Sequence, residues 1–137
     1  MKKTMIALFA VVLLMSAVIV PIGAAMPEDT VQPYWTNTNN IDCTMNVIDD
    51  VGYADCVVMG KFGATSIRTD IYVYEMIDDE WTYVTELHDV KNKQVSGVSC
   101  TFDAELGGYY RADYTFTVVK SGTSEVIDRT LYYTYES

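Results

Sequence analysis

The sequence predicts an all-β domain in which seven antiparallel strands form a two-sheet sandwich, preceded by a cleaved N-terminal signal peptide. Hydrophobic and polar residues alternate with a period of two along seven runs, as in strands that bury one face. Turn-forming segments separate these runs at a spacing typical of sandwiches and small barrels. The chain is also rich in strand formers, with 11 tyrosines among its 137 residues.

The first 25 residues have the three parts of a secretion signal. Two lysines precede an apolar run from Met5 to Ile22, and the small residues Gly23-Ala24-Ala25 follow it. We therefore expect cleavage after Ala25 and a secreted protein with no stable membrane insertion. The alternative is an uncleaved helical anchor, because about 17 to 20 apolar residues can cross a bilayer. Residues 26–40 are polar and irregular, and we expect a flexible leader whose Tyr34-Trp35 clips onto the domain.

The sandwich domain is predicted to span residues 41–137. The expected strands, in chain order, are Ile41–Ile48, Tyr53–Lys61, Ser66–Met76, Trp81–Val90, Val95–Ala104, Tyr109–Lys120 and Glu125–Glu136. Between them lie segments rich in Asp, Asn, Gly and Ser, which favour turns. The alternation also predicts the core-facing rows: for example, Tyr110, Ala112, Tyr114, Phe116 and Val118 share one face of their strand.

Part of the sequence resembles immunoglobulin-like and fibronectin type III-like sandwiches. The stretch LGGYYRADYTFTV, which begins at Leu106, is similar to the corner and strand that carry a conserved tyrosine in those folds. The resemblance implies that the hydroxyl of Tyr110 bonds to the backbone upstream. It also departs from antibody domains, because Ala112 stands where their second cysteine lies. We therefore expect an immunoglobulin-like architecture without membership of the antibody family.

The chain after the signal is also similar to a family of small secreted proteins of unknown function from Gram-positive bacteria. The shared features are the leader Pro33-Tyr34-Trp35, Asn40-Ile41, Tyr53-Ala54-Asp55-Cys56, Trp81, and Gly108-Tyr109-Tyr110-Arg111. This resemblance implies a class and a compartment, and it implies no activity.

Each of the three cysteines falls on a core-facing row. If the first turn is a two-residue loop at Asp49-Asp50, Cys43 and Cys56 face each other, at a separation that a disulfide can span. Cys56 with Cys100 is the competing pair if their strands are neighbours, as they are in immunoglobulin-like sheets. Buried reduced thiols are the third alternative.

The sequence gives no grounds for an enzyme or a cofactor. The single histidine, His88, follows Leu87 in a strand and is expected to be solvated. Core-facing cysteines lack the activated thiolate that nucleophilic catalysis requires. Without the signal, seven basic and nineteen acidic residues leave a net charge of −12, because the signal contains two of the nine basic residues and no acid. Such a charge argues against nucleic acid as a partner.

Charged residues are sorted between the two ends of the predicted sandwich. Alternate connections between antiparallel strands lie at the same end, so one end collects Asp49, Asp50, Asp78, Asp79 and Glu80. The other end collects Lys61, Lys91, Lys93 and Lys120. Clustered carboxylates could bind calcium, although no EF-hand-like loop is present. The lysine end could contact an anionic partner or the acidic end of another copy.

A set of aromatic residues is the candidate binding face. The set comprises Tyr72, Tyr74, Met76, Tyr133 and Tyr135, from strands that share a sheet in immunoglobulin-like sandwiches. Tyrosine is enriched at recognition surfaces because it offers a large area at little entropic cost. Cross-strand pairing that merely stabilises the sheet is the alternative.

These observations favour a secreted, non-enzymatic binding module whose partner is a protein or glycan at a cell surface, of the organism itself or of a host. The alternative is a secreted toxin-like or antimicrobial protein that acts on membranes.

Overall fold

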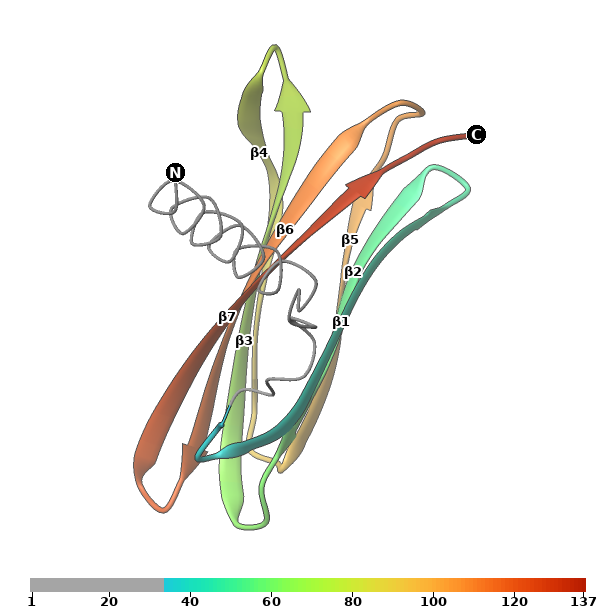
Figure 1. Cartoon of the computed structure of the whole chain (residues 1–137). Coiled ribbons are helices and arrows are strands. Elements are labelled where there is room, and N and C mark those ends of the chain that lie inside the picture. The colour runs from blue at the N-terminus through green and yellow to red at the C-terminus, as the bar shows by residue number, and fades with distance from the viewer. Residues whose placement is uncertain (1–33) are drawn as a thin grey trace, which may run out of the picture. The chain divides into compact units, whose positions relative to one another are not determined.

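Seven strands make up the fold in this computed structural model, which describes residues 34–137 (Figure 1). The strands are β1 (Thr38–Ile48), β2 (Val51–Gly60), β3 (Ala64–Ile77), β4 (Glu80–Lys91), β5 (Val95–Asp103), β6 (Tyr109–Lys120) and β7 (Thr123–Thr134). The predicted signal peptide and residues 26–33 of the predicted leader lie outside the described residues. Among residues 34–137 there is no helix of the length and apolarity needed to cross a membrane.

The strands form two antiparallel sheets, which confirms the predicted class. One sheet has the order β1-β2-β5 and the other the order β4-β3-β6-β7. The division places β2 beside β5, and β3, β6 and β7 together, as the immunoglobulin-like resemblance implies. We call the second, four-stranded sheet the large sheet.

Two-residue turns fix the register of three hairpins. Both central residues are left-handed in Asp49-Asp50, Asp78-Asp79 and Ser121-Gly122. Such turns have the twist that suits antiparallel strands, and aspartate tolerates this backbone region better than most residues do. Ile48 consequently lies opposite Val51, and Ile77 lies opposite Glu80. The loops are therefore shorter, and the strands longer, than the sequence alone indicates.

The core lies between the two sheets and is dominated by aromatic and β-branched side chains. Tyr110, Tyr114 and Phe116 on β6 are almost fully buried, and they pack against Ile71 and Val73 on β3 within one cluster. Burying each of these large side chains contributes roughly 1.5–3 kcal/mol. The Tyr110 hydroxyl accepts a hydrogen bond of 2.8 Å from the backbone N–H of Glu105. The corner tyrosine implied by the resemblance is therefore present.

Residues 35–37, which precede β1, are held to the domain by side-chain contacts. The side chain of Asn37, which is 5% exposed, donates to the carbonyls of Val118 and Thr123. Glu125 on β7 accepts hydrogen bonds from the backbone N–H groups of Thr36 and Asn37 and from the Thr36 hydroxyl. Arg129 lies over the Trp35 ring, 5.1 Å from its centroid. The last part of the expected flexible leader is thus anchored, and β1 starts at Thr38 rather than at Ile41.

Candidate functional site

A β-bulge in β4 determines which side chains reach the outer face of the large sheet. Val73 pairs with Thr85 and Tyr74 pairs with Tyr83, so Val84 is an additional residue in β4. Val84 packs against the core, as Leu87 does. Because the bulge reverses the alternation, Trp81 and Tyr83 lie on the outer face instead of the core face.

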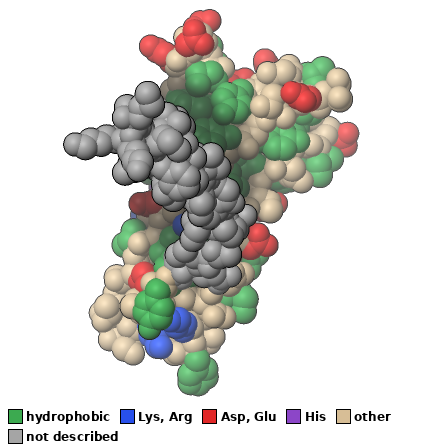
Figure 2. All heavy atoms as spheres, viewed as in Figure 1, with side chains coloured by type: hydrophobic (Ala, Val, Ile, Leu, Met, Phe, Trp, Pro, Cys, Tyr) green, Lys and Arg blue, Asp and Glu red, His purple; other side chains and the backbone are tan. Residues whose placement is uncertain are grey.

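The bulge completes a group of aromatic side chains that spans the large sheet from edge to edge. We call this group the aromatic platform: Trp81 and Tyr83 from β4, Tyr74 from β3, Tyr109 from β6 and Tyr132 from β7. In Figure 2, hydrophobic side chains gather in the upper half of the view, where Figure 1 places β3, β4 and β6.

Three rings of the platform form a triangle. The ring centroids of Trp81 and Tyr109 are 5.2 Å apart, those of Trp81 and Tyr132 are 5.9 Å apart, and those of Tyr109 and Tyr132 are 6.0 Å apart. Tyr132 is 57% exposed and Tyr109 is 37% exposed, so the triangle presents ring surface to solvent. Such offset ring pairs contribute roughly 0.5–1.5 kcal/mol beyond the area that they bury.

Arg111 on β6 lies within the platform. Its guanidinium is 4.4 Å from the centroid of the Tyr74 ring and 4.9 Å from the centroid of the Trp81 ring. Its Nη2 atom is 3.2 Å from Oδ2 of Asp113, two residues further along the strand. The buried Nε atom has no hydrogen-bond partner in the structure. Two rings and one carboxylate thus hold the guanidinium in place.

Polar side chains occupy the rows next to the platform. Thr130 on β7 donates a 3.0 Å hydrogen bond to Asp113, and Thr115 on β6 donates a 2.9 Å hydrogen bond to Asp128. These pairs face each other across the β6–β7 ladder. The outer face therefore changes from aromatic to hydrogen-bonding along the strands.

His88 is held between two carboxylates on the same face. Its Nδ1 atom is 2.5 Å from Asp70, and its Nε2 atom is 2.9 Å from Glu86. The hydrogen bonds to Asp70 and Glu86 raise the pKa of His88 above its ordinary value. Partial burial raises the pKa of Asp70, but hydrogen bonds from Arg68 and His88 outweigh it and lower that pKa overall. The histidine predicted to be solvated is thus an exposed side chain that is hydrogen-bonded to two carboxylates.

The structure divides the predicted binding face between two surfaces. Tyr72, Tyr74 and Met76 lie on the outer face of β3, opposite Glu86, Tyr83 and Trp81 respectively. Tyr133, however, lies opposite the buried Tyr110, and Tyr135 packs against the core. Successive strand residues point to opposite faces, so the outward tyrosine of β7 is Tyr132, and Tyr133 and Tyr135 do not belong to this face.

The residues of the predicted acidic end lie at two strand connections. Asp49 and Asp50 lie between β1 and β2, and Asp78, Asp79 and Glu80 lie at the β3–β4 connection at the same end of the sandwich (Figure 1). Figure 2 shows carboxylates gathered at the upper end of the view. Asp50 accepts a 2.9 Å hydrogen bond from the Tyr135 hydroxyl. Within the described part of the chain, no group of three or more His, Cys, Asp or Glu side chains is arranged to hold a metal ion.

The positions of Cys43 and Cys56 agree with the prediction made for a two-residue turn at Asp49-Asp50. Cys43 is directly opposite Cys56, whereas Cys100 is opposite Ala54. No disulfide joins the three thiols in the structure. Burial raises the pKa of Cys43 to about 11 and that of Cys56 to about 12. Both thiols are therefore protonated at neutral pH and are poor nucleophiles.

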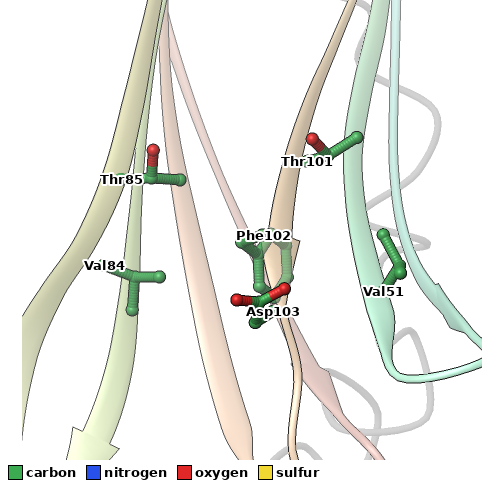
Figure 3. A pocket seen from close by; sticks show the side chains of 6 residues that line it. All are labelled: Val51, Val84, Thr85, Thr101, Phe102 and Asp103. Carbon is green, nitrogen blue, oxygen red and sulfur yellow. The ribbon is translucent and has the colours of Figure 1, made fainter.

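A shallow cavity of about 320 Å³ lies between the free edges of the two sheets (Figure 3). Val84 and Thr85 of β4 form one wall, and Val51 and Thr101 lie on the opposite side. Phe102 and Asp103 of β5 lie between these walls. The cavity contains no basic side chain and no activated thiol, and it holds one carboxylate. The platform, with its exposed rings and hydrogen-bonding groups, is therefore the stronger candidate for a recognition site.

No protein-family model and no curated protein matches the sequence. Among solved structures, the chain is similar to OgpA from Akkermansia muciniphila, with 9% identity and a TM-score of 0.46, over 81% of this chain and 32% of that one. It is also similar to a β-glucuronidase from Parabacteroides merdae, with 10% identity and a TM-score of 0.42, over 69% of this chain and 13% of that one. The chain thus spans a third or less of each, and a likeness at these TM-scores supports no conclusion about activity.

Proposed function

We propose that this protein is a binding module that recognises a neutral glycan through the aromatic platform of its large sheet. The observation that carries the proposal is the triangle of Trp81, Tyr109 and Tyr132, in which the two tyrosine rings are exposed and Trp81 is partly buried. One face of a pyranose ring presents C–H groups that pack on aromatic rings, while its hydroxyl groups need hydrogen-bonding partners. Binding sites commonly combine such apolar contact area with a few placed polar groups.

Charge supports a neutral ligand over an anionic one. The residues after the predicted signal have a net charge of −12, with seven basic and nineteen acidic residues. Arg111, within the platform, is paired with Asp113, and Arg68, six residues before Tyr74 on β3, is paired with Asp70. A sulfated or uronate-rich polymer would approach these carboxylates against electrostatic repulsion. A neutral sugar pays no such cost.

The proposal includes export. The segment of residues 1–25 has the composition of a secretion signal, and a binding module without it would meet extracellular glycans. Expression in a Gram-positive host, followed by intact mass measurement, tests this point. A secreted product that begins at Met26 supports export, and an intact intracellular chain contradicts it.

The binding proposal is tested by affinity electrophoresis through gels that contain soluble neutral, uronate-rich or sulfated polysaccharides. We expect retardation by at least one neutral polysaccharide, and a loss of at least tenfold in affinity for Trp81→Ala and for Tyr132→Ala. Truncation of a central aromatic anchor typically costs about 2 kcal/mol or more.

Phe62→Ala is the matched control. Phe62 is 90% exposed in the turn between β2 and β3, at the end of the sandwich opposite the β3–β4 turn. Its truncation should leave retardation unchanged. Retardation that survives both platform substitutions, or that occurs with sulfated polymers alone, would refute the proposal. Leakage of anionic lipid vesicles in a parallel assay would instead favour the membrane-active alternative.

A further inference from the structure

The charged pair formed by Arg111 and Asp113 lies at the boundary between the aromatic and polar parts of the outer face. Arg111 is directly opposite Tyr132 across the β6–β7 ladder, and Asp113 is directly opposite Thr130. The two side chains are 21% and 37% exposed. A ligand in contact with Tyr132 would therefore lie beside both charged groups.

Asp113 is held in a defined orientation. Its Oδ1 atom accepts the 3.0 Å hydrogen bond from Thr130, and its Oδ2 atom is 3.2 Å from Nη2 of Arg111. An ionised carboxylate has about four lone-pair positions, so acceptor capacity remains on each oxygen. The fixed carboxylate can accept a hydrogen bond from a ligand without losing either contact.

Arg111 retains donor capacity as well. A guanidinium has five N–H donors, and the contact with Asp113 involves one of its terminal nitrogens. The rings of Tyr74 and Trp81, whose centroids lie 4.4 and 4.9 Å from the guanidinium carbon, restrain the position of the group. The Nε atom is buried, so the donors that remain for a ligand belong to the terminal nitrogens, whose one polar contact is with Asp113. An incompletely satisfied, immobilised guanidinium is suited to donate to a ligand.

We propose that Arg111 and Asp113 together select a vicinal diol of the sugar that stacks on the platform, an inference that rests on the proposed function. One hydroxyl oxygen accepts from an Nη–H of Arg111, and the adjacent hydroxyl donates to Asp113. A donor and an acceptor 3.2 Å apart match the spacing of two neighbouring hydroxyl groups. The pair is neutral overall, so it favours a neutral diol over a carboxylate or a phosphate, which Asp113 would repel.

The experiment is a cycle of protein and ligand changes, read by NMR titration of the ¹⁵N-labelled protein. The probes are methyl β-D-glucopyranoside, methyl β-D-galactopyranoside and methyl α-D-mannopyranoside, each with its 2-, 3- and 4-deoxy analogues. For the wild-type protein, we expect that removal of either of two adjacent hydroxyl groups weakens binding at least fivefold. For Asp113→Asn, the dissociation constants of the parent sugar and of these two analogues should lie within twofold of one another.

The control is Asp128→Asn, which changes a carboxylate on the same face that has no contact with Arg111. The Asp128→Asn variant should prefer the parent sugar over the deoxy analogues as strongly as the wild-type protein does. This control separates a general effect of lost charge from selection of the diol. Arg111→Lys keeps the charge but loses the planar fork, and it should also lose discrimination.

The outcomes separate the two proposals. Sugar binding that requires Trp81 but is equally strong for deoxy analogues, or discrimination that persists in Asp113→Asn, overturns the diol assignment and leaves the proposed function intact. The absence of binding by every pyranoside, together with no retardation by any polysaccharide, overturns both.

Discussion

Glu125→Gln tests whether the segment before β1 is part of the folded domain. Glu125 accepts hydrogen bonds of 2.5 and 3.1 Å from the backbone N–H groups of Thr36 and Asn37, and one of 2.6 Å from the Thr36 hydroxyl. Burial raises the pKa of the carboxyl, but these hydrogen bonds outweigh it, and the pKa falls from 4.5 to about 2. The ionised carboxylate is therefore bound more tightly than the protonated one.

The size of the effect follows from that shift. Each pKa unit corresponds to about 1.4 kcal/mol of differential interaction, so the shift sets an upper bound of roughly 3 kcal/mol. Because the carboxylate is near the surface, solvent screening reduces this value to about 1–2 kcal/mol. The glutamine side chain keeps one acceptor oxygen, and we expect Glu125→Gln to lower the free energy of unfolding by about 1–2 kcal/mol at pH 7.

The pH dependence has a definite sign. A carboxyl with a lowered pKa in the folded state stabilises that state fully above its unfolded pKa, and the contribution is lost as the pH falls through its folded pKa. The wild-type advantage should therefore be constant above about pH 5 and should shrink between pH 4.5 and pH 2. Urea unfolding of the purified protein, followed by tryptophan fluorescence at pH 7, 4 and 3, measures it.

The control for this prediction is Asp128→Asn. Asp128 is on the same strand and accepts a single 2.9 Å hydrogen bond from Thr115, and its replacement should change the unfolding free energy by about 0.5 kcal/mol or less. Equal stability of wild type and Glu125→Gln at pH 7, or a difference that does not vary between pH 7 and pH 3, would show that Glu125 does not anchor the segment.

Two further predictions concern the core and the cysteines. Tyr110→Phe leaves the backbone N–H of Glu105 without its acceptor, so we expect the free energy of unfolding to fall by about 1–3 kcal/mol. The Tyr114 hydroxyl donates to the Thr44 carbonyl at 3.2 Å, and Tyr114→Phe should lower the free energy of unfolding by about 0.5–1.5 kcal/mol. Equal losses in urea unfolding would contradict this ranking. When the protein is treated with oxidised glutathione, we expect a disulfide between Cys43 and Cys56, and glutathione is reduced as the two thiols are oxidised. The two residues face each other across a hairpin with a two-residue turn, at a non-hydrogen-bonded position with a typical Cα separation of about 4.5 Å. Peptide mapping that finds Cys56 joined to Cys100 would refute this expectation.

The class of the fold, the positions of the seven strands along the chain and most of the buried rows follow from local patterns in the sequence. These are local properties, because a period of two requires only that one face of each strand be buried. The buried residues of β6, from Tyr110 to Val118, match the alternation of the sequence. The facing positions of Cys43 and Cys56 depend in addition on the turn length, because they require a two-residue turn at Asp49-Asp50, and the structure has that turn.

The composition of the candidate site depends on pairing between strands. One additional residue, Val84, reverses the faces of β4 and brings Trp81 and Tyr83 to the outer surface. A bulge depends on pairing with a neighbouring strand, and no short sequence pattern specifies it. For a similar reason the choice between Tyr132 and Tyr133 on β7 required the register with β6, since a shift of one residue exchanges the two faces. The hydrogen bond from Thr36 to Glu125 links residues that are 89 positions apart. Alternation along the chain carries no information about such a contact.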